Sequence, residues 1–294
     1  MASYEINGKV ALITGGARGI GLGTARALRA RGARVVIVDL HLDAAQAAAA
    51  QLGDESQAIG LGADVTDRGA MQRAVATTVE HFGGLDIVMA NAGIANRAAT
   101  LRVMSSESFD RVIDVDTMGV VRTVEVALPE IVRRRGHIVV VASIYAFTNG
   151  VGVIPYAMSK AAVEQLGRAL RVELVPHGAS ASVAYFGFID TEMVRQGIDH
   201  DPLAGEMMKT LPRPLHKRLT PQQAGEAVAR GIEERKPRII VPRRWIPLSV
   251  LRGVLGPLLD RMQERDAATR AVVEKLDHRD GEEQPTTVEA QAGG

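Results

Sequence analysis

A tyrosine and a lysine that could move a proton together lie four residues apart, Tyr156 and Lys160, in the segment Y-A-M-S-K. Side chains at this spacing share one face of a helix, so the phenol and the ammonium would point into one site. A nearby cation favours the phenolate, which a tyrosine with a pKa near ~10 rarely forms at neutral pH. Ser143, thirteen residues upstream, could hydrogen-bond the same substrate oxygen. These residues fit proton exchange with an alcohol or a carbonyl, although a Tyr and a Lys at this spacing often only cover a helix surface.

The composition describes an ordinary globular protein. Of 294 residues, 46% are apolar and 23% are charged, enough for a full hydrophobic core. The net charge of +1 gives no reason to expect nucleic acid binding. Seven histidines are scattered without metal-ligand spacing, and the lack of cysteine excludes disulfides and thiolate chemistry. The start lacks the layout of a secretory signal and no run of ~18 uncharged apolar residues occurs, so we expect a cytoplasmic protein with no transmembrane segment and no metal.

Short apolar runs alternate with helical segments along most of the chain. Strands are expected at 9–14, 34–39, 58–64, 85–90, 136–142, 181–186 and 238–241, and helices at 19–30, 42–52, 68–82, 106–132, 155–175 and 220–234. Such alternation predicts a parallel sheet with helices on both faces, and right-handed crossovers make it doubly wound. The expected fold class is therefore α/β, with a single Rossmann-like domain over residues 1–242.

A glycine-rich segment, T-G-G-A-R-G-I-G over residues 14–21, joins the first expected strand to the first helix. Glycines there allow a tight turn, and the helix N-terminus offers unpaired N–H groups to a pyrophosphate. Asp39 ends the second strand, where a carboxylate can bind the adenosine ribose and repel a 2′-phosphate, or can cap the next helix. Arg18 could instead bind that phosphate. Because Asp39 is expected to lie closer to the 2′ position of the adenosine ribose than Arg18 does, the predicted cofactor is NAD, with NADP less favoured.

Together these motifs resemble those of the short-chain dehydrogenase/reductase (SDR) family, in its basic single-domain branch. The resemblance covers residues 6–242. It rests on segment 14–21, Asp64-Val65, Asn91-Ala92-Gly93, Ser143, Tyr156-x-x-x-Lys160 and the segment from Gly187 to Thr191. Each motif alone is weak, but their order and spacing together are specific. The resemblance implies a Rossmann fold, a nicotinamide cofactor and an oxidoreductase that acts on CH–OH groups.

By this resemblance Tyr156 is the acid/base of the reaction. Ser143 positions the substrate oxygen, and Lys160 lowers the pKa of the tyrosine and binds the nicotinamide ribose. The family usually has an asparagine in the helix before the fifth strand, where it holds a water in a proton relay to the lysine. Here Asp116 takes that place. Its carboxylate could accept from the water or could pair with Lys160 directly, so Asp116 is counted as a fourth catalytic residue whose role stays open.

The resemblance also implies which residues hold the cofactor. They belong to the glycine turn and to the ends of several strands: Gly15, Ala17, Arg18, Gly19, Ile20, Gly21, Asp39, Asp64, Val65, Asn91, Ala92, Gly93, Gly187, Ile189 and Thr191, together with Tyr156 and Lys160. Asp64 and Val65 are expected beside the adenine, and Ile189 and Thr191 beside the nicotinamide carboxamide and the phosphates. Phe186 replaces the usual proline before Gly187, where its ring would shape the nicotinamide pocket or merely end the strand.

Three segments are expected to have roles of their own. Residues 187–219 are rich in Pro, Met and charge and suit a mobile substrate flap. Residues 243–276 form a helical C-terminal extension, and the tail 277–294 has few apolar residues and is expected to be disordered. Within the extension, 243–262 could dock on the domain, contact another subunit or make peripheral contact with a membrane. The first two are favoured because Pro247 and Pro257 would break a long lipid-facing helix.

The residues expected around the substrate are mostly apolar, among them Ile94, Phe147, Phe188 and Met207, although several could instead be core. The predicted function is therefore NAD-dependent interconversion of a secondary alcohol and a ketone, on a small hydrophobic substrate of steroid, terpenoid or lipid type. Two alternatives stay open, an NADPH-dependent ketoacyl-type reductase and a non-catalytic NAD-binding scaffold. The resemblance also implies a homodimer or homotetramer, assembled through the helices at 106–132 and 155–175.

Overall fold

The computed structural model describes residues 3–210 and 215–279 and contains one parallel sheet. Its strand order is β3-β2-β1-β4-β5-β6-β7. The strands are β1 (Val10–Thr14), β2 (Arg34–Asp39), β3 (Ala58–Gly62), β4 (Ile87–Ala90), β5 (His137–Ser143), β6 (Ser180–Phe186) and β7 (Arg238–Val241). The order reverses between β1 and β4, which leaves a crevice at the carboxyl ends of these strands. The doubly wound, Rossmann-like α/β fold predicted from the sequence is confirmed.

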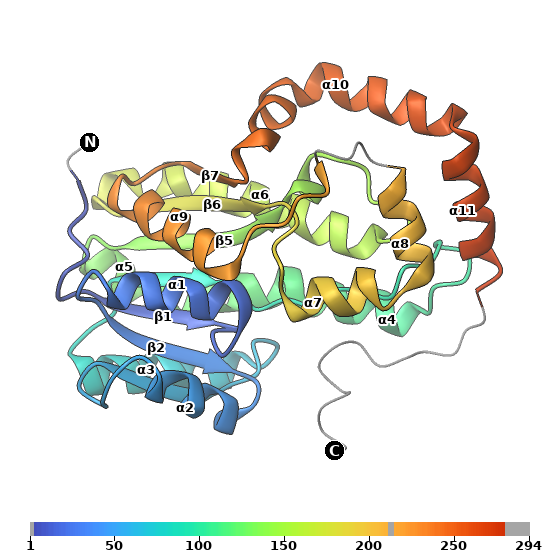
Figure 1. Ribbon diagram of the computed structural model, residues 1–294. Coiled ribbons are helices and arrows are strands. Elements are labelled where there is room, and N and C mark those ends of the chain that lie inside the picture. The colour runs from blue at the N-terminus through green and yellow to red at the C-terminus, as the bar shows by residue number, and fades with distance from the viewer. Residues whose placement is uncertain (1–2, 211–214, 280–294) are drawn as a thin grey trace.

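Helices cover both faces of the sheet (Figure 1). On one face lie α1 (Gly19–Arg29), α2 (Leu42–Ala50) and α9 (Pro221–Glu233), and on the other lie α3 (Arg68–Phe82), α5 (Gly119–Arg133) and α6 (Ile154–Glu173). Every residue of β1, β5 and β6 is buried. A strand covered on both faces has no solvent side, which is why these segments read as nearly continuous apolar runs in the sequence.

The helix expected over residues 106–132 is interrupted. It consists of α4 (Ser106–Ile113) and α5, joined by a π-helical turn at Asp114–Met118. A π-helical turn holds an extra residue, so it rotates the side chains that follow it relative to a regular helix. Within this turn Asp116 is the buried residue. The interruption therefore gives a carboxylate a place inside the fold that a continuous surface helix would not.

The C-terminal extension is two helices rather than one. After β7 a 3₁₀ turn leads into α10 (Ile246–Arg265) and α11 (Ala267–Asp277), and Asp266 caps α11 by accepting a hydrogen bond from Thr269 N. Pro257 lies inside α10 without ending it, and Pro247 lies in its first turn. The expectation that these prolines break the helix is therefore wrong. In the part of the chain that the structure describes, no helix is long and apolar enough to cross a membrane.

The extension arches away from the body and returns to the substrate flap (Figure 1). The flap contains α7 (Glu192–Val194), a π-helical turn at Arg195–Asp199 and α8 (Pro202–Lys209), while residues 211–214 lie outside the described chain. Arg279 Nη2 lies 2.6 Å from Asp201 Oδ1, and both side chains are nearly buried. Leu276 packs with Ala98 in a small apolar cluster that includes Met207. Of the tail expected to be disordered, residues 280–294 also lie outside the described chain.

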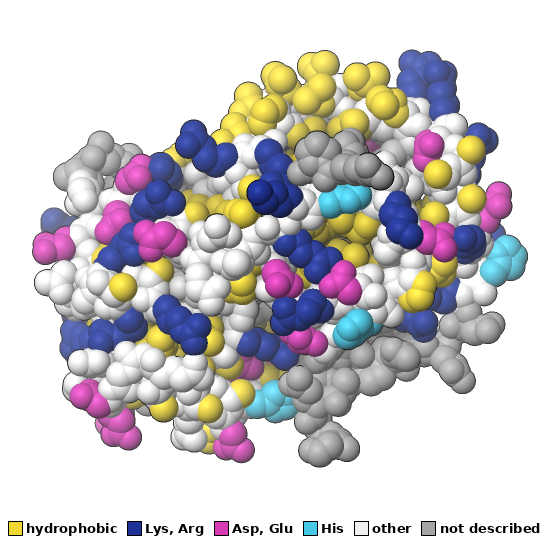
Figure 2. Space-filling model, viewed as in Figure 1, with side chains coloured by type: hydrophobic (Ala, Val, Ile, Leu, Met, Phe, Trp, Pro, Cys, Tyr) yellow, Lys and Arg dark blue, Asp and Glu magenta, His cyan; other side chains and the backbone are white. Residues whose placement is uncertain are grey.

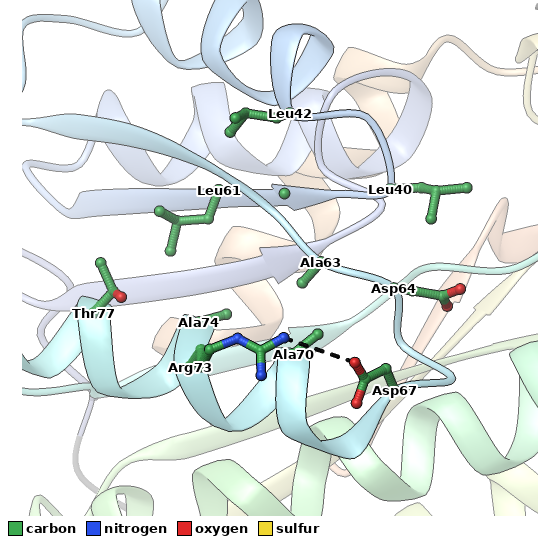
Figure 3. Close-up of a pocket in the computed structure, with 11 residues that line it drawn as sticks. Leu40, Leu42, Leu61, Ala63, Asp64, Asp67, Ala70, Arg73, Ala74 and Thr77 are labelled. Atoms are coloured by element: carbon green, nitrogen blue, oxygen red, sulfur yellow. Dashed lines mark ion pairs between the residues drawn. The ribbon is translucent and has the colours of Figure 1, made fainter. Parts of the chain in front are cut away.

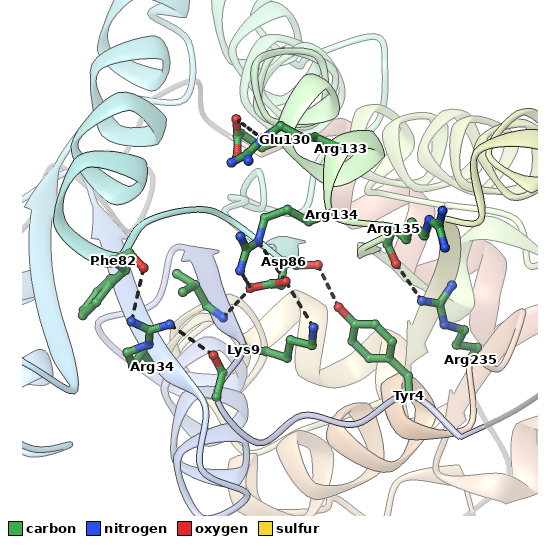
Figure 4. Close-up of polar contacts among 12 residues, drawn as sticks. Tyr4, Lys9, Arg34, Phe82, Asp86, Glu130, Arg133, Arg134, Arg135 and Arg235 are labelled. Carbon is green, nitrogen blue, oxygen red and sulfur yellow. Dashed lines mark hydrogen bonds and ion pairs between the residues drawn. The ribbon is translucent and has the colours of Figure 1, made fainter.

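The amino ends of the strands are tied together by a buried carboxylate, Asp86 (Figure 4). It accepts from Val10 N at 3.0 Å and from Arg134 Nε at 3.0 Å, and it lies 3.4 Å from Lys9 Nζ. The Tyr4 hydroxyl donates to the Asp86 carbonyl at 3.3 Å. Every polar atom of Asp86 is thereby engaged within the fold. This end of the sheet is held by structural contacts, and the residues predicted to do chemistry lie at the opposite, carboxyl end.

Candidate active site

Ser143, Tyr156 and Lys160 come together where β5 ends and α6 begins. Ser143 is the last residue of β5, Tyr156 lies in the first turn of α6, and Lys160 follows one turn later. The Ser143 hydroxyl donates to the Phe186 carbonyl at 3.3 Å and lies close enough to the Tyr156 phenol to lower its pKa. The ammonium of Lys160 lies 5.2 Å from the centre of the tyrosine ring. The arrangement places two hydroxyl groups side by side with a cation behind them.

Lys160 is paired directly with Asp116. Its Nζ lies 2.9 Å from Asp116 Oδ2, and the two side chains are 4% and 0% exposed. Asp116 Oδ1 accepts from Ile94 N at 2.7 Å. A Cβ on Gly93 would lie 3.0 Å from Asp116 Oδ2, so the carboxylate fits because that residue is glycine. Of the two roles left open for Asp116, the structure shows the direct ion pair.

The charges in this cluster act on one another. Burial raises the pKa of Tyr156 and Asp116 adds to that effect, while Lys160 and the Ser143 hydrogen bond lower it without offsetting burial. Burial works to lower the pKa of Lys160, but Asp116 and Tyr156 outweigh it and raise that pKa. Burial likewise raises the pKa of Asp116, against the effect of Lys160. Lys160 therefore acts on the tyrosine in the expected direction, yet the phenol is protonated at neutral pH, the form that donates to a carbonyl oxygen.

A second tyrosine, Tyr145, belongs to the cluster, although the sequence has no lysine four residues after it. Its ring meets Tyr156 edge-on, with the two centres 5.8 Å apart. Its backbone N–H donates to Ser143 Oγ at 3.3 Å. Burial, together with Tyr156, raises the pKa of Tyr145 to about 12. Its position two residues after Ser143, in the turn that closes the strand, is the signal that could have placed it here.

The glycine turn forms a backbone cradle between β1 and α1. Gly15 has a φ of +59°, and a Cβ on Gly21 would lie only 2.5 Å from the Gly15 carbonyl oxygen. The Asn91 side chain donates to the carbonyls of Thr14 and Gly15 at 2.9 and 3.0 Å. Arg18, at the N-cap of α1, makes no side-chain hydrogen bond to the helix. The uncapped N-terminus of α1 and the lack of room for side chains fit the pyrophosphate of a dinucleotide.

Thr14 supports this cradle and was missed as a site residue in the sequence. Its hydroxyl accepts from Asn91 N at 3.0 Å and from Ala92 N at 3.1 Å. The side chain is buried. Its two hydrogen bonds connect the end of β1 to the residues that follow β4. Its position as the first residue of the glycine segment was the signal in the sequence that could have identified Thr14 as a site residue.

Asp39 faces the glycine turn rather than the next helix. Its Oδ2 accepts from Ala17 N at 3.1 Å, and its Oδ1 accepts from Leu40 N at 3.0 Å. The N-cap of α2 is His41, which makes no side-chain capping bond. Of the two roles considered for Asp39, capping α2 is therefore excluded. The carboxylate lies beside the cradle, and Arg18 is exposed on the same turn.

The segment after β6 contributes unequally to the site. Thr191 lies over the glycine turn, because a Cβ on Gly19 would be 3.3 Å from its Cγ2. Ile189 is 1% exposed and packs in the core with Ile20 at its edge. Gly187 packs against the Trp245 indole, which leaves no room there for a side chain. Phe186 is buried in the core on the sheet face covered by α1 and α9. Of the two roles expected for its ring, this position fits packing at the end of the strand.

Asp64 lines a hollow of about 490 Å³ at the edge of the sheet (Figure 3). The hollow lies between α2, β3 and α3 and is lined by Leu40, Leu42, Leu61, Gly62, Ala63, Asp64, Asp67, Ala70, Arg73, Ala74 and Thr77. Asp64 Oδ1 accepts from Thr66 N at 2.8 Å, and Val65 is buried against Gly119. The hollow is therefore on the side where adenosine was expected, and none of its lining residues belongs to the cluster around Tyr156.

Several residues expected to line the substrate pocket are core instead. Ile94, Phe147 and Phe188 are each less than 9% exposed. Phe147 packs against Tyr185 and Phe188 against Trp245. The apolar character of the flanking segments therefore reflects packing as much as it reflects a binding surface.

Comparison with known proteins places the chain in a family. Residues 9–201 match the model of the short chain dehydrogenase family. A short-chain reductase, NovJ, of Streptomyces niveus is 38% identical over 68% of this chain and 79% of its own length. Galactitol 2-dehydrogenase of Agrobacterium fabrum is 36% identical over 64% and 73%. A 3-alpha-(or 20-beta)-hydroxysteroid dehydrogenase of Mycobacterium bovis is 36% identical over 65% and 73%.

Solved structures agree with this. A short-chain type dehydrogenase/reductase from Mycobacterium marinum superposes with a TM-score of 0.72 at 29% identity, covering 81% of this chain and 95% of that one. A 3-ketoacyl-(acyl-carrier-protein) reductase from Brucella melitensis, complexed with NADH, gives 0.68 at 27% identity, covering 80% and 97%. With the fold, the glycine cradle and the serine–tyrosine–lysine cluster in place, the chain belongs to the short-chain dehydrogenase family, oxidoreductases that act on alcohol groups with a nicotinamide cofactor.

Proposed function

We propose that this enzyme interconverts a secondary alcohol and a ketone with NAD, and that Tyr156 is its acid/base. The observation that carries the proposal is the cluster at the end of β5, where the Ser143 and Tyr156 hydroxyls adjoin and Lys160 lies 5.2 Å from the tyrosine ring. A bound nicotinamide would accept or supply the hydride. The residues of this chain would supply the proton and orient the substrate oxygen.

Each residue has a definable task in ketone reduction. The hydroxyls of Ser143 and Tyr156 would hydrogen-bond the carbonyl oxygen, and the phenol would transfer its proton to that oxygen as negative charge develops there. The phenolate that remains would be stabilised by the Lys160 ammonium. Asp116 raises the pKa of Lys160 and so keeps it protonated. Alcohol oxidation would use the same atoms in reverse.

The preference for NAD is proposed from the position of Asp39 beside the cradle. A carboxylate there favours free ribose hydroxyls and repels a 2′-phosphate. We expect tighter binding of NADH than of NADPH in a fluorescence titration, and we expect Asp39→Asn to reduce the ratio of the two affinities about tenfold, through loss of roughly 1.4 kcal/mol of repulsion. Asparagine keeps one oxygen that can accept from Ala17 N and loses only the acceptor for the exposed Leu40 N, so the turn should survive.

The matched control is Asp43→Asn, which removes the same charge from the exposed first turn of α2. It should leave the ratio unchanged. A wild-type enzyme that binds NADPH more tightly than NADH would overturn the choice and would favour the ketoacyl-type reductase as the alternative function.

We further propose a hydrophobic substrate of steroid, terpenoid or lipid type. Its support is the apolar side chains beside the cluster that stay partly exposed, such as Val153, Ile154 and Met193, and the similarity to a hydroxysteroid dehydrogenase. The galactitol dehydrogenase is equally similar by identity and acts on a polyol by its name, so a direct comparison is needed.

A spectrophotometric screen of secondary alcohols with NAD makes that comparison. Hydrophobic cyclic and long-chain alcohols should give a higher kcat/KM than galactitol and sorbitol, because burying each CH₂ of a substrate contributes about 0.8 kcal/mol. Turnover of polyols without turnover of hydrophobic alcohols would refute this substrate class while leaving the reaction type intact.

The oligomeric state, the localisation and the domain boundaries are further proposals. A homodimer or homotetramer would assemble through α5 and α6, and the enzyme would be cytoplasmic. The catalytic domain would end at residue 242 and the helical extension at residue 276. A non-catalytic scaffold is disfavoured because the chain retains Ser143, Tyr156 and Lys160 in one cluster.

A further inference from the structure

The helix α10 exposes large apolar side chains along its length. Val250, Leu251, Val254, Leu258, Leu259 and Met262 are each at least 39% exposed, and Val254 is 73% exposed. They recur every three or four residues and so form one stripe, which we call the α10 ridge. Figure 2 shows a band of hydrophobic side chains over this helix, at the edge of the molecule where α10 stands away from the sheet.

Several polar side chains of α10 hold the helix to the rest of the protein. Ser249 is buried, and Arg252 Nη1 donates to Glu164 Oε2 of α6 at 2.7 Å. Asp260 and Gln263 both accept from the Asn149 side chain at 2.6 Å. A surface helix of a soluble domain ordinarily buries its apolar face and exposes its polar one. These contacts fix α10 in the opposite orientation.

The outward face has almost no charge to keep it in water. Between Ile246 and Leu259 the sequence contains one charged residue, Arg252, and that residue is paired with Glu164. Within α10 only Ser249 is fully buried, so the helix gains little from packing, although packing supplies most of the stability of helices in proteins. An apolar surface of this extent marks a site of interaction with a protein or a membrane.

Two features favour lipid over a second protein surface. The ridge is aliphatic and contains no aromatic residue, whereas the anchors of protein interfaces are enriched in Tyr, Trp and Phe. Arg243 and Arg244 stand together before the helix, while Arg261 and Arg265 in its last turns alternate with Asp260, Glu264 and Asp266. Arginines beside an aliphatic stripe match anionic headgroups above acyl chains.

We propose that α10 binds the surface of an anionic phospholipid bilayer, with the ridge at the boundary of the acyl chains and the flanking arginines at the headgroups. The helix would lie in the plane of the membrane, since the anchors at Ser249, Arg252 and Asp260 hold it along the body of the enzyme. This inference does not depend on the proposed substrate or cofactor.

A single fluorescent label tests the position of the ridge. The chain has no cysteine, so Val254→Cys in the full-length protein accepts an environment-sensitive dye at one site. Vesicles of phosphatidylcholine with phosphatidylglycerol should shift its emission to the blue and raise its intensity severalfold. The control is Ala47→Cys, at an exposed alanine of α2, which should show neither change. An equal response at both sites, or none at Val254, would overturn the proposal.

Flotation with the same vesicles tests the energetics. The double variant Val254→Asp with Leu258→Asp should lower the vesicle-bound partition coefficient at least about tenfold, because each aliphatic side chain contributes about 1.5–3 kcal/mol when buried. Its turnover of a water-soluble alcohol should be unchanged. The control pair Ala44→Asp with Ala47→Asp, at exposed positions of α2, adds the same charges and should bind like the wild type.

Two further measurements distinguish lipid binding from contact between copies of this chain. Vesicles of phosphatidylcholine alone should bind the wild type more weakly, and equal binding would remove the role assigned to the arginines. Light scattering on each variant reports the oligomeric mass. If the wild type ignores vesicles and the Val254→Asp with Leu258→Asp variant has a smaller mass, the ridge is a contact between copies of this chain and the lipid proposal is overturned.

Discussion

Replacement of Tyr156 by phenylalanine should lower kcat about 10²–10⁴-fold, the range that a positioned general acid or base contributes. The loss follows from the geometry, since the variant keeps the ring beside Lys160 and Tyr145 and removes only the hydroxyl that adjoins Ser143. The cofactor cradle lies on β1, α1 and β4, whereas Tyr156 lies on α6. The free energy of unfolding should therefore stay close to that of the wild type, and NADH binding, which keeps all its other expected contacts, should weaken far less than kcat.

The measurement is steady-state kinetics on any alcohol that the substrate screen identifies, with urea unfolding as the test of the fold. Tyr145→Phe is the matched control, because it removes a hydroxyl group from a neighbouring tyrosine. The two ring centres lie 5.8 Å apart, and burial raises the pKa of Tyr145 as well. It should reduce kcat by less than about tenfold. A Tyr156→Phe enzyme that keeps its turnover would remove the acid/base from Tyr156 and with it the proposed mechanism.

The fold was predictable because its local signals agree with one another. Segments such as Arg34–Asp39 are apolar and β-branched and end in turn residues, and they form strands buried on both faces. The glycines of residues 14–21 indicate a backbone that must approach itself closely, and the structure shows that contact at Gly15 and Gly21. These features are encoded within a few residues of one another, so periodicity and turn chemistry are enough to find them.

The features that sequence reasoning missed depend on contacts between distant residues. The π-helical turn that buries Asp116 has no local signature, and its partner Lys160 is on another helix. Similarly, the stripe of α10 predicts an amphipathic helix but not its direction. That direction is set by Glu164 and Asn149, which bind Arg252 and Asp260 from elsewhere in the chain. The local sequence pattern therefore predicts the helices and strands, while the orientation of each one can be seen only in the tertiary structure.

Removal of Asp116 should destabilise the protein by about 3–5 kcal/mol, the usual cost of leaving one partner of a buried ion pair uncompensated. In Asp116→Ala the Lys160 ammonium would stay almost without exposure and would lose the carboxylate 2.9 Å away. The Ile94 N–H would also lose its acceptor. Urea unfolding of wild type and variant at neutral pH measures the difference.

Asp116→Asn separates these two losses, because it is close in size to aspartate and can still accept from Ile94 N but carries no charge. If the charge dominates, the asparagine variant should be nearly as unstable as the alanine variant. A variant with most of the wild-type stability would show that the hydrogen bond and the filled volume matter more than the ion pair.

The pH dependence provides a sharper test of the charge. In the wild type Asp116 raises the pKa of Lys160 above its ordinary value, so the stability from the pair is fully present below about pH 10 and is lost only as pH rises through the folded-state pKa. Without the carboxylate, burial acts against a much weaker opposing charge and lowers the pKa of Lys160. The unfolded chain then binds more protons than the folded one, so the stability of both variants should rise between about pH 7 and pH 9.5 while that of the wild type is not changed by this group. A deficit that is equal at the two pH values would place the role of Asp116 in packing, not in holding the lysine charged.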